Sequence, residues 1–149
     1  MSLFFGSSHE RFLKALFVEL VQGDTGLINA HKLHRALTIT ITYHRYRVIS
    51  RKTTSMLMKL VDRDHPGILT KEQFFHLHRV VVCLWKSFID YDRNNSGWIR
   101  RADIRAAMAS VNLQLTDDQV NEVLGSDRRR VWITLDYYLQ LCATCMLYR

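Results

Sequence analysis

The chain has 149 residues, of which 48% are hydrophobic and 23% charged, and its formal net charge is +7. This composition is typical of a globular protein and excludes an intrinsically disordered one, while the length suits one domain or two small lobes that share a core. The positive charge is compatible with an acidic partner or an anionic membrane surface, and equally with a basic face that is simply solvated.

The cysteines indicate a reducing compartment. There are three, Cys83, Cys142 and Cys145, and an odd number without framework spacing argues against a disulfide scaffold. The last two form a C-x-x-C pattern within a helical pattern, so we expect core or half-buried thiols rather than a redox pair or half a zinc site. No apolar run approaches the ~20 residues that cross a bilayer, and residues 1–6 are too short for a signal peptide. The expected location is the cytoplasm, with peripheral membrane association left open.

Four copies of one helix–loop–helix pattern follow one another along the chain. If each loop is numbered as a 12-residue calcium-binding loop, an aliphatic residue recurs at position 8: Ile28, Leu69, Ile99 and Ile133. We expect these residues to pair in short antiparallel bridges between neighbouring loops. The predicted fold is therefore all-α, in a single domain over residues 1–149. Its units are a first hand and linker (1–61), a second hand (52–91), a third (84–112) and a fourth (116–149).

The first unit is not expected to bind calcium. Ser8 is a candidate N-cap for its first helix, which has one apolar face. The loop ends on Lys32, where a calcium loop needs a carboxylate. After it, residues 38–52 are predicted to be irregular and extended at first, because β-branched residues run from Ile39 to Thr42. We interpret this stretch as a linker that shields a hydrophobic groove, since its basic and aromatic residues are too few to indicate nucleic-acid binding.

The second loop is a weak calcium candidate. Asp62 and Asp64 stand at positions 1 and 3 and Thr70 at position 9, but Pro66 at position 5 offers no side-chain ligand and Gln73 at position 12 is neutral. From Lys71 to about Tyr91 neither Gly nor Pro interrupts a helical pattern. This long helix leaves the second loop and enters the third, so it should couple the two halves. Its predicted core face comprises Phe74, Leu77, Val81, Leu84, Trp85 and Phe88.

The third loop carries the strongest functional signal. Side-chain oxygens stand at positions 1, 3 and 5 (Asp92, Asn94, Ser96), followed by Gly97 at the sharp turn. The Trp98 carbonyl serves at position 7 and the Asp103 carboxylate at position 12, which completes the ligand order of an EF-hand. Two features weaken the site: Asp at position 12 is one methylene shorter than Glu, and position 9 holds a cation, Arg100. The alternative is a loop that keeps the fold and has lost the ion.

The fourth unit begins with a capping box, Thr116 with Gln119. Its loop has Arg128 and Arg130 at positions 3 and 5 and Tyr137 at position 12, so it should repel a cation. The arginines could bind phosphate or carboxylate, or form a solvated loop tip. The last helix is apolar, and we expect its surface to need a cover.

These motifs together resemble the penta-EF-hand family. The resemblance rests on the second loop, on Trp85 to Gly97, on residues 113–116 and on residues 133–142, and it extends over roughly residues 8–149. It implies a calcium-responsive adaptor that exposes an apolar groove to a protein or peptide partner. Family members have five hands and dimerise through the fifth. The sequence stops after the helix where a fifth hand would begin, so family-type dimerisation is left open.

The sequence supports at most one or two weak calcium sites, because no loop has Glu at position 12. The alternative function is a calcium-independent structural or regulatory subunit with degenerate EF-hands. An enzyme is not expected, since we find no nucleophile–base pair, no phosphate loop and no paired catalytic carboxylates. A nucleic-acid partner is not favoured either.

Overall fold

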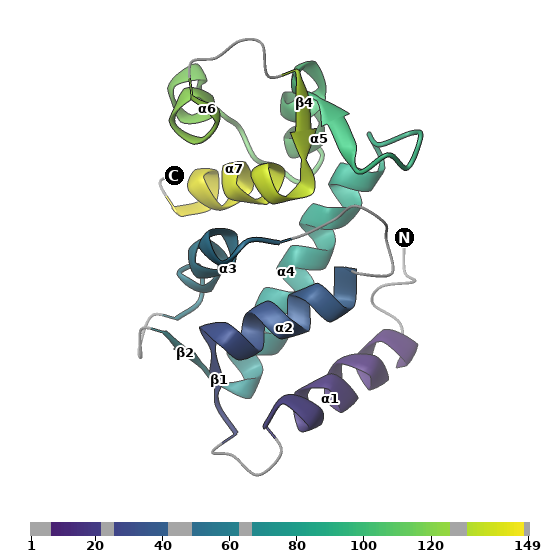
Figure 1. Ribbon diagram of the computed structural model, residues 1–149, viewed down its shortest axis with the longest axis vertical. Coiled ribbons are helices and arrows are strands. Elements are labelled where there is room, and N and C mark those ends of the chain that lie inside the picture. The colour runs from purple at the N-terminus through teal and green to yellow at the C-terminus, as the bar shows by residue number, and fades with distance from the viewer. Residues whose placement is uncertain (1–6, 22–25, 42–48, 63–66, 126–130, 148–149) are drawn as a thin grey trace.

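The computed structural model describes residues 7–21, 26–41, 49–62, 67–125 and 131–147 (Figure 1). The first half contains α1 (Ser7–Val21), β1 (Ile28–Asn29), α2 (Ala30–Ile41), α3 (Arg51–Met58) and β2 (Ile68–Leu69). The long helix α4 (Lys71–Ile89) leads to the second half, which contains β3 (Trp98–Arg100), a 3-10 turn η2 (Arg101–Asp103), α5 (Ile104–Ala109), α6 (Asp117–Leu124), β4 (Trp132–Thr134) and α7 (Leu135–Leu147). The all-α prediction with short strand pairs is confirmed.

The predicted bridges between loops are present. β1 pairs with β2 in antiparallel fashion with Ile28 opposite Leu69, and β3 pairs with β4 with Ile99 opposite Ile133. All four position-8 side chains are buried. Each pair of loops is thus tied at its centre by two aliphatic residues that also enter the core.

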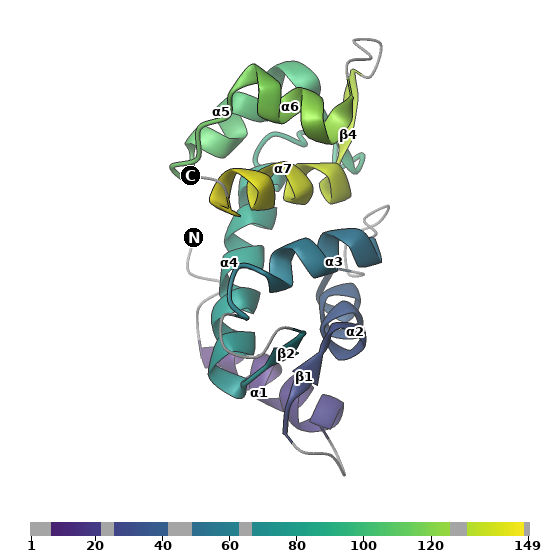
Figure 2. The ribbon, with the colours of Figure 1, turned by 90° about the vertical axis from the view of Figure 1, so that its left-hand side faces the viewer.

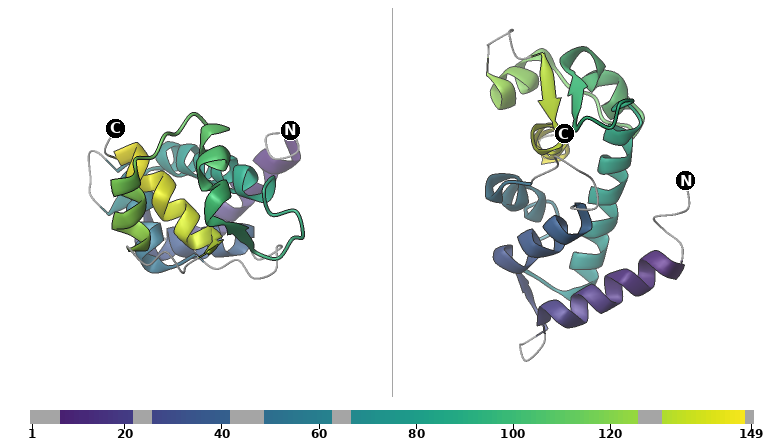
Figure 3. Two further views of the ribbon diagram at one scale, coloured as in Figure 1. Left: turned by 90° about the horizontal axis from the view of Figure 1, so that it is seen from above. Right: turned by 45° about the vertical axis from the view of Figure 1, so that its right-hand side comes forward.

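Helix α4 runs through both halves of the molecule, with α1–α3 around one end and α5–α7 around the other (Figure 3). Its start is fixed by a capping box in which Thr70 Oγ1 accepts a hydrogen bond from the Gln73 amide. All six residues of the predicted core face are buried, among them Trp85 and Phe88. The prediction of a long shared helix is confirmed.

The prediction that the segment after the first loop is extended is wrong. Residues 38–41 continue α2, in which the Thr40 hydroxyl donates to the Ala36 carbonyl at 2.8 Å and lies 2.9 Å from His78 Nε2 on α4. Tertiary packing of this helical face outweighs the β-propensity of the branched residues. Residues 51 and 52 are helical too, because Ser50 caps α3. Of the expected shielding linker, residues 38–52, the part 42–48 lies outside the described residues. Ser8 lies inside α1 rather than before it.

The two halves meet where α3 lies against α7, beside α4 (Figure 2). A polar network crosses this interface. Asp136 Oδ1 accepts a hydrogen bond from the Ser50 amide at 2.7 Å, and the Gln140 side-chain amide donates to Thr53 Oγ1 at 3.0 Å. The expected need for a cover over the last helix is therefore met within the chain, by α3, α4 and α6.

Candidate functional site

The third loop is organised around the carboxylate of Asp92. This residue follows α4 and is 5% exposed. Its Oδ1 accepts hydrogen bonds from the Ser96 amide at 2.9 Å and the Ser96 hydroxyl at 3.0 Å, and its Oδ2 accepts one from the Gly97 amide at 2.8 Å. One buried carboxylate thereby holds the middle of the loop in place.

The sharp turn of the loop depends on backbone conformations that most residues avoid. Gly97 has φ +91° and Asn95 has φ +50°, both in the left-handed region. The turn brings the Trp98 carbonyl to 3.3 Å from the Ser96 hydroxyl. Loop oxygens from positions 1, 5 and 7 are consequently close together.

The five predicted ligands share one cavity of about 340 Å³. Its wall includes Asp92, Asn94, Ser96, Trp98 and Asp103. Each has an oxygen atom that can bind a metal ion: two carboxylates, one side-chain amide, one hydroxyl and one backbone carbonyl. A hard cation such as calcium prefers oxygen ligands of these kinds. Arg93 and Arg100 line the same cavity and place positive charge beside it. The residues therefore fit a calcium ion by chemistry, with fewer carboxylates than strong sites use.

Asp103 stands at an irregular helix start. The residue at position 9, Arg100, has no side-chain oxygen and makes no capping bond, so the chain passes through the single 3-10 turn η2 before α5 begins at Ile104. The Asp103 side chain is half-buried and makes no capping bond to α5. Its carboxylate is thus not committed to the helix terminus.

The second loop differs, because its late positions serve the helix cap. Asp62 Oδ2 accepts from the Gly67 amide at 2.8 Å, the same contact that Asp92 makes with Gly97. Thr70 caps α4, and Gln73 Oε1 accepts from the Thr70 amide at 2.9 Å. Asp64 lies outside the described residues, so of this weak candidate the structure places only Asp62 and Thr70.

The first and fourth loops show no carboxylate at position 12. The Lys32 amide donates to Asn29 Oδ1 at 2.8 Å, which caps α2 through position 9. Tyr137 is half-buried, and residues 126–130, including Arg128 and Arg130, lie outside the described part of the chain. Within that part, no group of three or more His, Cys, Asp or Glu is placed to hold a metal ion.

Comparison with known proteins places this loop in a family context. No protein-family model matches the chain. Human sorcin is 26% identical over 122 residues, which are 82% of this chain and 62% of sorcin. Penta-EF hand domain-containing protein 2 of Dictyostelium discoideum is 29% identical over 99 residues, which are 66% of this chain and 48% of that protein. The relatives of this chain are penta-EF-hand proteins.

The solved structures agree with this relationship at the level of fold. A homolog of programmed cell death 6 protein from Leishmania major Friedlin superposes with a TM-score of 0.62 at 22% identity, over 87% of this chain and 72% of that one. The chain spans less than two thirds of the length of either curated relative. The predicted resemblance to the penta-EF-hand family is confirmed.

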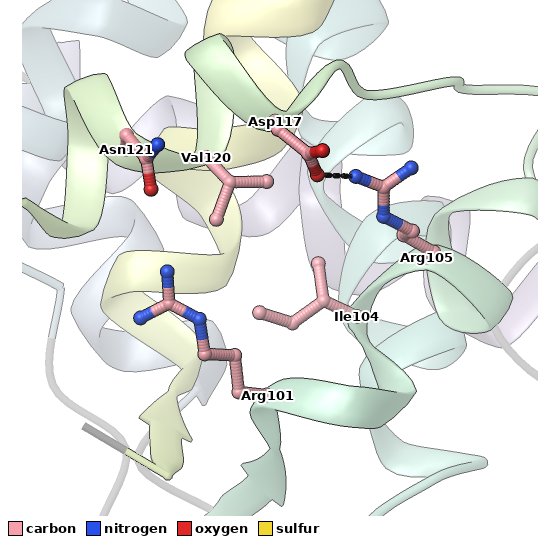
Figure 4. Close-up of a pocket in the computed structure, with 6 residues that line it drawn as sticks. All are labelled: Arg101, Ile104, Arg105, Asp117, Val120 and Asn121. Atoms are coloured by element: carbon pink, nitrogen blue, oxygen red, sulfur yellow. Dashed lines mark hydrogen bonds and ion pairs between the residues drawn. The ribbon is translucent and has the colours of Figure 1, made fainter. Parts of the chain in front are cut away.

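A second cavity lies next to α5, and no sequence motif predicted it. It measures about 420 Å³ and lies between η2–α5 and α6 (Figure 4). Ile104 and Val120 form its apolar wall, Arg101 and Arg105 its cationic one, and Arg105 forms an ion pair with Asp117. The spacing of residues 101, 104 and 105 indicates one helical face, but only the structure shows that α6 lies opposite.

Two buried titratable side chains belong to the core and not to this site. The Tyr138 hydroxyl lies 2.6 Å from Ser87 Oγ on α4, and burial raises the pKa of Tyr138. Burial also raises the pKa of the Cys142 thiol. The Cys145 thiol donates to the Gln114 carbonyl at 3.1 Å. Both C-x-x-C thiols are buried and free, as the sequence predicted, and Cys83 is exposed.

None of the described helices is both long and apolar enough to span a bilayer.

Proposed function

We propose that this chain is a calcium-responsive adaptor of penta-EF-hand type, located in the cytoplasm, with loop 92–103 as its principal calcium site. The observation that supports this most directly is the shared cavity of Asp92, Asn94, Ser96, Trp98 and Asp103. A bound calcium ion would supply a divalent charge that offsets the two carboxylates. Loop 62–73, with Asp62, Asp64 and Thr70, is a weaker second site in this proposal.

The affinity of the principal site should be low for a sensor. EF-hand affinity is tuned by the number of charged ligands and the rigidity of the loop, and sensors have dissociation constants of roughly 10⁻⁷–10⁻⁵ M. Here two carboxylates line the cavity and two arginines lie beside them. We therefore expect a dissociation constant above the usual sensor range.

The partner, in this proposal, is a protein segment that combines acidic and apolar side chains. The cleft between α5 and α6 has an apolar wall, Ile104 with Val120, and a cationic one, Arg101 with Arg105. Arg105 forms an ion pair with Asp117. A partner carboxylate could replace Asp117 at the Arg105 guanidinium. Asp103 directly precedes α5, so a change in its position would move Ile104 and Arg105 and alter the cleft.

A calcium-independent structural or regulatory subunit is the second candidate function. It is favoured by the contact between α3 and α7, which already covers the last helix, and by the cap contacts that engage Thr70 and Gln73 in the second loop. In this alternative the cleft between α5 and α6 binds its partner without calcium.

A calcium titration followed by tryptophan fluorescence separates the two functions. Trp98 is 44% exposed and lines the cavity, so its fluorescence reports on the loop. A Trp98→Phe variant shows whether the signal comes from it. Asp92→Ala removes a ligand but also three loop hydrogen bonds. Asp103→Asn is therefore the sharper variant, since its side chain makes no capping bond.

A saturable change that Asp103→Asn weakens at least tenfold would support the calcium site. No change up to millimolar calcium would exclude the calcium-responsive function and leave the constitutive subunit.

A further inference from the structure

The outer face of the β3–β4 pair carries two exposed tryptophans that the calcium loop does not explain. Antiparallel pairing sets Trp98 opposite Thr134 and Arg100 opposite Trp132. Because side chains alternate along a strand, Ile99 and Ile133 point into the core while the residues on either side of them share the opposite face. This face, with Trp98, Arg100 and Trp132, is called the tryptophan face below.

Two large apolar side chains are exposed together there. Trp98 is 44% and Trp132 54% exposed, and both line one hollow, whereas the third tryptophan, Trp85, is 2% exposed. Isolated exposed apolar residues need no explanation, but contiguous ones mark contact surfaces. Figure 2 shows β4 at the edge of the second half, and the exposure of both rings means that no other described element covers this face.

We propose that the tryptophan face binds the surface of a bilayer that contains anionic phospholipids. Tryptophan is the side chain that prefers the headgroup level of a membrane, because its ring is apolar and its N–H is polar. Arg100 is exposed and stands opposite Trp132, and the exposed Arg93 lines a cavity together with both tryptophans. The chain as a whole has a net charge of +7. Apolar insertion and basic charge are the two signals that stable peripheral binding requires.

The shape of the face favours a bilayer over a peptide. Anchoring side chains of a protein partner need well-packed pockets. Among the described residues, the hollow here, about 320 Å³, is bounded by Ser96, Trp98 and Trp132. Both tryptophans are exposed, as expected for side chains that enter an interface.

Charge links this face to the calcium loop without depending on it. Arg93 and Arg100 line the same cavity as the carboxylates of Asp92 and Asp103, so these four side chains have no net charge together. If the loop binds calcium, as proposed above, the local charge becomes positive and binding to anionic lipid should tighten. The tryptophan contacts remain in either case.

The test is co-sedimentation of the full chain with vesicles of phosphatidylcholine alone or with about one third phosphatidylserine, each in calcium and in chelator. We expect binding to the anionic vesicles, with quenching of tryptophan fluorescence by brominated lipid. The double variant Trp98→Ala/Trp132→Ala should bind at least tenfold more weakly. Arg100→Gln should lose roughly fivefold, since this is the effect of one basic residue near an anionic surface.

Matched controls remove the same chemistry elsewhere. Val18→Ala removes an apolar group that is 64% exposed on α1, and Arg51→Gln removes an exposed arginine on α3. Neither should change vesicle binding. Circular dichroism verifies that each variant is folded.

Three outcomes would overturn the proposal: no binding to anionic vesicles, undiminished binding of the double variant, or bound protein without quenching. The first would leave the face to a protein ligand. Equal binding in calcium and chelator supports the membrane site while arguing against the calcium site, so the two proposals fail separately.

Discussion

The start of α5 is the weakest feature of the candidate calcium loop, and two substitutions should repair it. Arg100→Thr would place a capping oxygen at position 9 and remove a cation from the cavity wall. Asp103→Glu would place a longer carboxylate at position 12. Thr70, at position 9 of the second loop, caps α4 by accepting a bond of 3.2 Å from the Gln73 amide, so a threonine at position 100 should cap α5 in the same way.

The expected gain has two parts. An N-cap oxygen stabilises a helix by about 1 kcal/mol, which for a chain of this length corresponds to a rise in Tm of roughly 2–4 °C. Unit charges about 4 Å apart in water interact by about 1 kcal/mol. Arg100 is exposed, so removing it from beside a divalent ion should improve calcium binding by about 1–2 kcal/mol, or roughly tenfold.

Calorimetric calcium titration and thermal unfolding in chelator measure the two parts separately. The matched control is Arg51→Thr, which makes the same chemical change at the exposed first residue of α3. The single variants Arg100→Thr and Asp103→Glu show whether the effects add. A raised Tm with unchanged calcium binding would show that the cap was repaired in a loop that does not bind the ion. If neither quantity changes, the explanation of the late start of α5 is refuted.

The remaining predictions concern the core. Asp136→Ala removes the acceptor for the Ser50 amide. The unsatisfied donor should lower the free energy of unfolding by about 2 kcal/mol and Tm by roughly 4–8 °C. The control Asp118→Ala, at an exposed position, should change Tm little. A disulfide reagent should label only Cys83 in the folded protein and all three cysteines in urea; fast labelling of a second thiol would contradict the observed burial. Burial raises the pKa of the Cys142 thiol, so as pH rises the thiol loses its proton in the unfolded chain before it does in the folded one. The free energy of unfolding should therefore fall as pH rises above about 8.5. Equal urea midpoints at pH near 7 and near 10 would contradict this.

Those parts of the fold that depend on short-range pattern could be predicted from the sequence. The register of both strand pairs follows from one aliphatic residue per loop, as Ile99 opposite Ile133 shows. The length of α4 follows from the absence of Gly and Pro and from apolar residues at helical spacing. The five predicted ligand residues of the third loop line one cavity because all of them come from a single 12-residue segment.

Features that depend on distant partners were missed. Residues 38–41 have high β-propensity, yet α2 continues through them because Thr40 packs against His78, 38 positions away. The contact between Asp136 and Ser50 joins residues 86 positions apart. No local pattern in either segment specifies such a partner. The tryptophan face lies between these cases, because once Ile99 is paired with Ile133, strand alternation alone sets Trp98 and Trp132 on the outer side.

The contact between α3 and α7 limits how any signal from the third loop can spread. α7 is held against α3 by two hydrogen bonds, from the Ser50 amide to Asp136 and from the Gln140 side chain to Thr53, and it also packs against α4 and α6. Exposing its apolar residues would break these hydrogen bonds and uncover a large apolar surface. Moving α5 requires less, because α5 is short and the ion pair that joins it to α6 is exposed at the surface. We therefore expect calcium-dependent changes to be confined to the cleft between α5 and α6, with α7 fixed. Hydrogen exchange in calcium and in chelator should show altered protection in residues 101–121 and unchanged protection in residues 135–147.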